Sequence, residues 1–183
     1  MKIRPATPED APSLAALSIE TWLNTYLRQG IGRDFAEFVL DQFTPAKFID
    51  WLRSPDETLL VSETSDGPDG YIRLTQDQPG PVPGCSDTEI STLYVRPRRH
   101  GRGIGKALLQ HALEHAANDG VADVWLMTNA ENTPAIGFYH RIGARDLGET
   151  HFCLGDARYP NRVFSLPTNF RTTDPKAGGS SGR

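Results

Sequence analysis

The chain has 183 residues, 38% of them hydrophobic, and this length and composition predict one domain with a buried core. No apolar run approaches the ~20 residues of a membrane helix, and the N-terminus lacks the apolar segment of a signal peptide, so we expect a cytoplasmic protein without membrane association. The formal net charge of -4 argues against general nucleic-acid binding, and two cysteines are too few for a disulfide framework.

The first half of the chain alternates between strand and helix signals. Residues 2–4 are expected to form a strand, and a helix is expected from the capping residue Thr7 to about residue 26. Two further helical segments are expected, one at 34–43 and one after the Thr44–Pro45 cap. A hairpin follows, with strands at 58–64 and 71–76 around a turn at 65–70, and then a loop at 78–84.

The second half continues this alternation. A strand at 88–95 leads through a turn into a long helix at 103–117. The remaining expected elements are a strand at 121–128, a short helix at 133–141, and a closing pair of strands at 145–154 and 161–166. The order predicts a mixed α/β fold formed by residues 1–167, followed by a flexible tail at 168–183.

The segment from Leu93 to Leu109 joins the predicted strand to the long helix through a basic, glycine-rich turn. Glycines let backbone N–H groups approach an anion, and the first turn of a helix adds unpaired N–H groups and a favourable dipole. Basic side chains add full positive charges. The glycines are Gly101, Gly103 and Gly105, and the basic residues are Arg98, Arg99, Arg102 and Lys106. The segment is therefore predicted to bind phosphate, with an ordinary strand-to-helix turn as the alternative.

Spacing excludes the two best-known glycine-loop fingerprints. A dinucleotide fingerprint would place its third glycine at position 106, where the chain has Lys106. A P-loop would need serine or threonine after Lys106 and glycine at position 100, where the chain has Ala107 and His100. A different phosphate-containing ligand is expected.

The same segment resembles the acetyl-CoA pyrophosphate loop of the GNAT superfamily of N-acetyltransferases, whose signature is Gln/Arg-x-x-Gly-x-Gly/Ala. Aligning Gly103 and Gly105 with the two small residues puts His100 at the Gln/Arg position, whereas aligning Gly101 and Gly103 puts Arg98 there. We favour the first register, because it starts the helix at Gly103 and leaves an apolar stripe at helical spacing. That stripe consists of Ile104, Leu108 and Ala112.

A second block supports this resemblance independently. The run from Asn129 to Ala144 is similar to the family's Asn-x-x-Ala-x-x-Phe-Tyr-x-x-x-Gly-Phe motif. The matching residues are Asn132, Ala135, Phe138, Tyr139 and Gly143, and Ala144 replaces the final aromatic residue. Two motifs in the right order, one after each of two successive strands, are far harder to match by chance than either alone.

The resemblance implies the GNAT fold, a mixed and mostly antiparallel sheet of about seven strands with helices on both faces. The sheet is splayed between the fourth and fifth strands, where the cofactor enters. Acetyl-CoA is the implied co-substrate. The implied cofactor contacts are Leu93, Tyr94, Val95, Arg98, His100, Gly101, Arg102, Gly103, Ile104, Gly105, Lys106, Asn132, Ala135 and Tyr139. Asn132 is also suited to cap the helix that follows it, and the two roles are compatible.

Acetyl transfer from a thioester to an amine requires a base for the amine, stabilisation of the developing oxyanion, and an acid for the leaving thiolate. The resemblance assigns the oxyanion contact to backbone N–H groups near Leu93 to Val95. It assigns the acid to Tyr139, with a core aromatic paired with Phe138 as the alternative. Glu89 lies where some members of the family carry a base glutamate; the alternatives are an anchor for a cationic substrate and an exposed strand residue.

The implied reaction is direct transfer to a primary amine of a small molecule, such as a polyamine. Acidic residues that would suit a cationic acceptor are Glu20, Asp34, Glu37 and Asp87. Candidate substrate contacts on the first helix are Glu20, Trp22 and Tyr26, with core packing as the alternative for Trp22. The rival functions are acetylation of peptide or protein N-termini and non-catalytic acyl-CoA binding. The resemblance is also compatible with a homodimer.

No metal site is expected. His111 and His115 are four residues apart, but the glutamate of a zinc-protease motif would have to follow the first histidine directly, and Glu114 does not.

Overall fold

The computed structural model describes residues 1–26, 30–155 and 157–169. In these residues the helices are α1 (Ala11–Tyr26), α2 (Arg33–Gln42), α3 (Pro45–Arg53), α4 (Ile104–Asn118) and α5 (Thr133–Arg141), with short 3-10 turns η1 (Pro8–Asp10) and η2 (Pro97–Arg99). The strands are β1 (Lys2–Pro5), β2 (Glu57–Thr64), β3 (Gly67–Thr75), β4 (Glu89–Val95), β5 (Asp123–Asn129), β6 (Arg145–Leu154) and β7 (Ala157–Pro167). They form a seven-stranded sheet in the order β1-β2-β3-β4-β5-β7-β6.

The expected mixed α/β fold is confirmed, and two expected boundaries are wrong. The turn between β2 and β3 is shorter than 65–70, because β3 begins at Gly67 and pairs with β2 from there. Gly67 has a φ of 117°, which lets the chain reverse tightly, and Pro68 lies next to a β-bulge at Asp69 in its own strand, where a missing backbone N–H is tolerated. Strand β7 begins at Ala157 rather than 161, because it pairs with β6 along a hairpin arm. The predicted tail falls almost entirely outside the described residues and stays a prediction.

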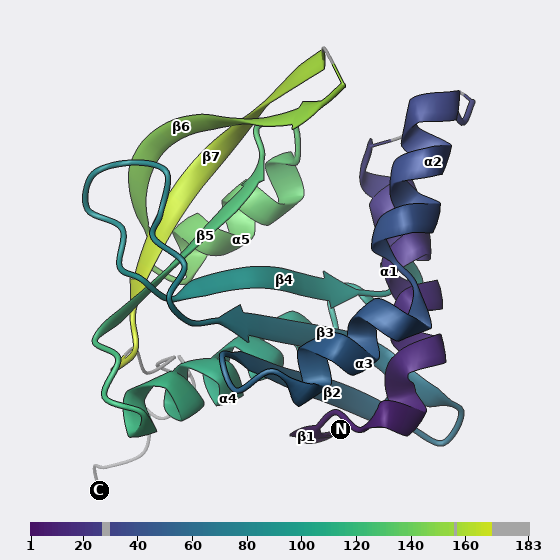
Figure 1. The fold of residues 1–183 in the computed structure, drawn as a ribbon. Helices are drawn as coiled ribbons and strands as arrows, with labels where there is room; N and C mark the ends of the chain where they lie inside the picture. The colour runs from purple at the N-terminus through teal and green to yellow at the C-terminus, as the bar shows by residue number, and fades with distance from the viewer. Residues whose placement is uncertain (27–29, 156, 170–183) are drawn as a thin grey trace, which may run out of the picture.

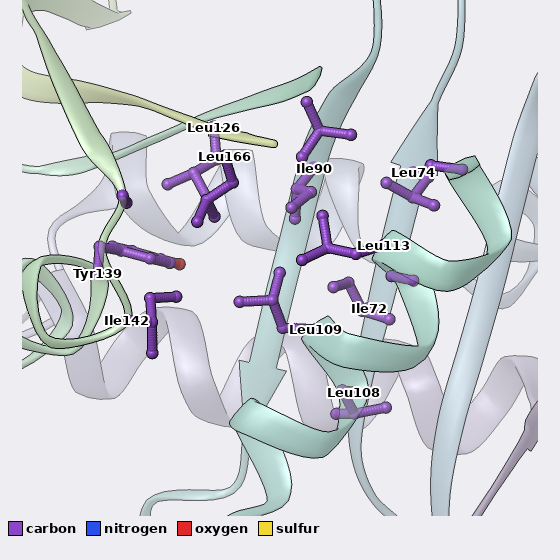
Figure 2. Close-up of a cluster of buried hydrophobic side chains, with 14 of the residues drawn as sticks. Ile72, Leu74, Ile90, Leu108, Leu109, Leu113, Leu126, Tyr139, Ile142 and Leu166 are labelled. Carbon is purple, nitrogen blue, oxygen red and sulfur yellow. The ribbon is translucent and has the colours of Figure 1, made fainter. Parts of the chain in front are cut away.

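Helices cover both faces of the sheet (Figure 1). Helices α4 and α5 pack on one face through a core that reaches all the central strands, and Figure 2 shows its centre. Labelled members of that core include Ile72, Ile90, Leu109, Leu126 and Leu166. Helices α1 and α3 pack on the other face against β2 and β3. Residues that alternate along a strand therefore point into different environments.

Strands β4 and β5 are neighbours in the sheet but diverge from one another (Figure 1). They are the parallel pair, and among the described residues they share one paired position, Glu89 with Trp125. Every other neighbouring pair is antiparallel and has at least four paired positions. We call this divergence beyond Glu89 and Trp125 the splay. It confirms the splayed sheet that the sequence led us to expect.

A buried carboxylate ties the first strand to the first helix. Asp10 accepts hydrogen bonds from the Arg4 guanidinium at 2.7 and 2.9 Å and from the Thr7 backbone N–H at 2.8 Å. The hydrogen bonds from Arg4 lower the pKa of Asp10. A carboxylate with a lowered pKa stabilises the fold above its unfolded pKa, and this stability is lost as the pH falls through the folded pKa.

We therefore expect Asp10→Asn to lower the free energy of unfolding by about 1–3 kcal/mol at pH 7, measured by urea denaturation. The difference from the unsubstituted protein should shrink as the pH falls from the unfolded pKa of about 4 through the lowered folded pKa of Asp10. Asp41→Asn is the control, because Asp41 makes an exposed ion pair with Lys47, which we expect to contribute less than about 1 kcal/mol. An equal loss in both variants would contradict the assignment.

Candidate functional site

The turn between β4 and α4 holds two glycines in the left-handed backbone region. Gly101 has a φ of 74° and Gly103 a φ of 79°, a conformation that favours glycine. Gly103 is the N-cap residue of α4, which starts at Ile104, so the predicted helix start is confirmed. No described side chain caps this helix, and its first N–H groups are left for a ligand or for water.

Two of the arginines in this turn are held by carboxylates. Arg96, which precedes η2, makes two hydrogen bonds of 2.7 and 3.2 Å to Glu20 on α1. Arg99 donates to the buried Asp69 of β3 at 2.8 Å, and the backbone N–H of Arg96 donates to the Asp69 carbonyl. Three basic residues of the turn have no ion pair with a described residue, and they are Arg98, Arg102 and Lys106. Glu20 and Asp69 therefore stabilise the turn, and the other three basic side chains can interact with a ligand.

His100 occupies the position where the family pattern has glutamine or arginine, and it makes a contact within the turn. Its Nε2 lies 2.8 Å from the carbonyl oxygen of Val95. Because a carbonyl only accepts, Nε2 must carry the proton and donate. The imidazole thus joins the end of β4 to the turn, and its predicted cofactor contact stays a prediction.

Along the splay, the described part of β4 has no neighbouring strand on its β5 side. Beyond Glu89, no described residue of β4 is paired with β5, so this edge of the strand lies outside the hydrogen-bonded sheet. This part of the strand contains Leu93, Tyr94 and Val95. Leu93 packs toward the α4 core, Val95 is buried, and the Tyr94 ring lies on the other face against Tyr71 at 5.8 Å.

Tyr139 of α5 is buried, yet its hydroxyl makes no hydrogen bond with a described residue. Its ring packs between Phe138 at 5.3 Å and Phe164 at 5.4 Å, measured between ring centroids. Figure 2 shows the hydroxyl pointing away from α5 toward the space between Leu109 and Leu166. Burial raises the pKa of Tyr139 far above its usual value, so the phenol keeps its proton at neutral pH. The ring belongs to the core, and the hydroxyl remains available to a ligand.

Glu89 lies at the closed end of the splay, on the face opposite the α4 core. Its neighbour Ile90 points into that core, so Glu89 points toward the face that carries α1 and α3. It makes no hydrogen bond or ion pair with a described residue. Burial raises the pKa of Glu89, the nearby Arg73 lowers it, and Glu57 raises it. The net rise makes Glu89 a stronger base than an ordinary carboxylate.

Asn132 and Ala135 stand at the start of α5. The Asn132 side chain accepts a hydrogen bond from the Ala135 N–H at 3.2 Å, which confirms the capping role. Ala135 packs against the α4 core. Their cofactor contacts stay predictions.

The predicted acceptor residues on α1 are not all free. Glu20 is paired with Arg96, and the Trp22 ring is buried against Phe35 and Phe38 of α2, each at 5.2 Å. Core packing is therefore confirmed for Trp22, while its substrate contact stays a prediction. The Tyr26 side chain lies outside the described residues. Of the other acids that would suit a cationic acceptor, Glu37 is paired with Arg33, and Asp34 and Asp87 are exposed.

Aromatic rings join α2 to the hairpin formed by β6 and β7, which we call the β6–β7 arm. Phe35 contacts Tyr159 at 5.6 Å and Phe38 contacts Phe152 at 5.4 Å, both edge-to-face. Sequence reasoning missed this contact, because the rings come from segments more than a hundred residues apart. It also missed Asp69 and Arg73, although a charged residue within a strand of otherwise buried residues is a usable signal.

Among the described residues, no group of three or more His, Cys, Asp or Glu side chains is arranged to hold a metal ion. No described helix is long and apolar enough to cross a membrane.

Comparison with known proteins shows which protein family the chain is similar to. The model of the acetyltransferase (GNAT) family matches residues 19–144. An uncharacterised N-acetyltransferase of Mycobacterium tuberculosis is 31% identical over 146 residues, which cover 80% of this chain and 90% of the relative. The ribosomal protein bS18 alanine N-acetyltransferase of Escherichia coli is 27% identical over 106 residues, covering 53% of this chain and 72% of the relative.

The fold is also shared with solved structures. PaiA N-acetyltransferase from Thermoplasma acidophilum, solved in complex with coenzyme A, superposes with a TM-score of 0.67. The match covers 88% of this chain and 96% of that structure at 20% identity, so it shows a common fold.

Proposed function

The chain belongs to the GNAT family of acetyltransferases and is an N-acetyltransferase that acts with acetyl-CoA, and from this premise we propose that it transfers the acetyl group directly to a primary amine of a small molecule. One observation carries the site assignment. The splay has a basic, glycine-rich turn at its open end and Glu89 at its closed end, and Tyr139 packs on Phe164, which pairs with Leu126 next to Trp125; neither Glu89 nor the Tyr139 hydroxyl is hydrogen-bonded to a described residue. A phosphate-bearing ligand with an extended arm and a reactive end matches this order of groups.

The residues of the turn fit the phosphates of coenzyme A. Gly101 and Gly103 are exposed, and the first N–H groups of α4 follow them without a side-chain cap. Arg98, Arg102 and Lys106 supply positive charge, and the edge of β4 that faces the splay would pair with the pantetheine arm as an added strand. When bound, acetyl-CoA supplies an activated acyl group as a thioester.

The two catalytic candidates approach the closed end of the splay from opposite faces of the sheet. Tyr139 comes from the face that carries α4 and α5, and its protonated hydroxyl would donate to the departing sulfur. Glu89 comes from the face that carries α1 and α3, and its carboxylate would accept the proton of the amine. Backbone N–H groups of β4 would polarise the carbonyl oxygen. These roles require no covalent link to the protein.

A peptide N-terminal amine is the rival acceptor, and the similarity to the ribosomal protein bS18 alanine N-acetyltransferase favours it. The described structure favours a small acceptor, because the aromatic contacts between α2 and the β6–β7 arm join the two elements on the side that the acceptor would approach. An acceptor screen with acetyl-CoA decides between them, with free thiol as the readout. Polyamines, amino acids, aminoglycosides and alanine-starting peptides should be compared at equal concentration. Turnover with peptides alone would overturn the small-molecule proposal, and absence of any amine-dependent thiol release would leave a non-catalytic acyl-CoA-binding module.

The turn makes a separate prediction about cofactor affinity. We expect Arg102→Ala to weaken coenzyme A binding about fivefold, because an exposed ion pair contributes up to about 1 kcal/mol. Titration calorimetry with coenzyme A measures this without an acceptor. Arg53→Ala at the end of α3 is the matched control, an exposed arginine outside the turn. Equal affinities of the two variants would show that Arg102 makes no phosphate contact.

A further inference from the structure

A cluster of charged and hydroxyl side chains lies where β2, β3 and β4 run side by side. The strand register places Glu57, Thr75 and Glu89 opposite one another across the three strands. Arg73 lies two residues before Thr75 on β3, so it projects from the same face of the sheet. Arg73 therefore lies diagonal to the carboxylates of both Glu57 and Glu89. The charge around Glu89 depends on which of the two carboxylates Arg73 pairs with.

Arg73 pairs with Glu57 rather than with Glu89. The distance from the Arg73 guanidinium to the Glu57 carboxylate is 3.4 Å, and both side chains are largely buried. The guanidinium also lies over the Trp51 ring, 3.9 Å from its centroid, and Trp51 belongs to α3, which packs on β2. No ion pair joins Arg73 to Glu89 within the described part of the chain. The ion pair and the ring both hold the guanidinium on the β2 side.

Glu57 is itself fixed by a chain of hydroxyl groups. The Thr75 hydroxyl donates to Glu57 Oε2 at 3.0 Å and is also hydrogen-bonded to the Ser91 hydroxyl. Because Thr75 has a single hydroxyl proton, Ser91 must be the donor in the second bond. Ser91 is the extra residue of a β-bulge in β4, directly beyond Glu89 and Ile90. The bulge therefore orients the carboxylate that retains Arg73.

We propose that Glu57 and Trp51 are positioning residues, which hold Arg73 on the β2 side of the sheet so that Glu89 has no cationic partner and accepts the proton of the acceptor amine. This inference rests on the proposed function. In that step an N–H bond of the ammonium group breaks, an O–H bond forms on the Glu89 carboxylate, and the nitrogen lone pair becomes available to attack the thioester. A guanidinium bonded to Glu89 would instead stabilise its ionised form and make it a weaker base.

The charges around Glu89 give the expected direction of each substitution. Burial and Glu57 raise the pKa of Glu89, Arg73 lowers it, and the β5 neighbour Trp125 is uncharged. Removal of Glu57 takes away a like charge and releases Arg73, so both effects strengthen the ionised form of Glu89. Removal of Arg73 has the opposite effect. A merely structural role of the cluster would not predict shifts of opposite sign.

The test is a carbon-13 NMR titration of the Glu89 carboxyl in the full chain, with the signal assigned through Glu89→Gln. Glu57→Gln and Trp51→Leu should move its midpoint to lower pH, by about one unit for Glu57→Gln, and Arg73→Gln should move it to higher pH. Arg73→Met serves the same purpose if the glutamine variant does not fold. Glu63→Gln is the matched control, a glutamate on the same strand that pairs with Lys2 and Arg4, and it should leave the midpoint unchanged.

Shifts of the same sign in Glu57→Gln and Arg73→Gln, or no shift in either, would overturn the proposal. The low-pH limb of kcat/KM should move in the same directions as the NMR midpoints. The NMR readout does not need turnover. Failure to find any amine acceptor would therefore contradict the proposed function while leaving the positioning of Arg73 measurable.

Discussion

Tyr139→Phe should lower kcat by about 10²–10⁴-fold at saturating acetyl-CoA, the usual contribution of a positioned general acid. The Tyr139 hydroxyl keeps its proton and makes no hydrogen bond with a described residue, so its removal takes away a proton donor and little else. The stability of the variant should stay close to that of the unsubstituted protein, because the removed hydroxyl makes no hydrogen bond with a described residue. Single-turnover thiol release and a thermal melt measure the two effects.

Tyr71→Phe is the matched control for this prediction. Tyr71 is also buried, but its hydroxyl is hydrogen-bonded to Ser18 of α1 at 2.7 Å, and burial raises its pKa to about 12. The control should lose about 0.5–1.5 kcal/mol of stability and retain its turnover. If Tyr139→Phe behaved like this control, with lower stability and unchanged kcat at every pH, Tyr139 would be a core residue only.

Glu89→Gln should lower kcat/KM by about 10²–10⁴-fold near neutral pH, because an alkylamine with a pKa of about 10.4 is almost fully protonated there. A base acts only when it is deprotonated, so activity should fall as the pH drops through the raised pKa of Glu89. The glutamine variant should lack this low-pH limb and recover activity at high pH, where free amine is abundant. The pH profile of kcat/KM measures both effects.

The alternative role for Glu89 is to anchor a cationic acceptor, and the same variant separates the two roles. An anchor contributes to acceptor binding, so its loss would raise the KM for the amine and leave kcat nearly unchanged. A base contributes to the transition state, so its loss lowers kcat and kcat/KM together. Asp50→Asn is a suitable control, because Asp50 is an exposed carboxylate on α3 that was not predicted to contact the acceptor.

Local chemistry explains why so much of the fold could be predicted from the chain alone. Helix α5 has the predicted bounds, because Asn132 caps it and Pro134 suits its first turn. Helix α4 starts after Gly103, because the preceding turn needs positive φ at two positions. The β2–β3 turn was predicted wrongly, because proline and glycine are typical of turns, and pairing across a bulge depends on the partner strand.

The sequence by itself determined the element order, the glycine-rich turn before α4 and the motif residues, since these depend on neighbours within about one helical turn. Which charges remain free was decided only by the tertiary structure. Arg96 and Arg99 are paired with Glu20 and Asp69, and His100 is hydrogen-bonded to the Val95 carbonyl. These three side chains therefore stabilise the turn itself. Arg73 likewise forms an ion pair with Glu57, and Glu89 makes no ion pair with a described residue. Charges pair with whatever folding brings within about 4 Å, and strand register and helix docking set those distances across dozens of residues.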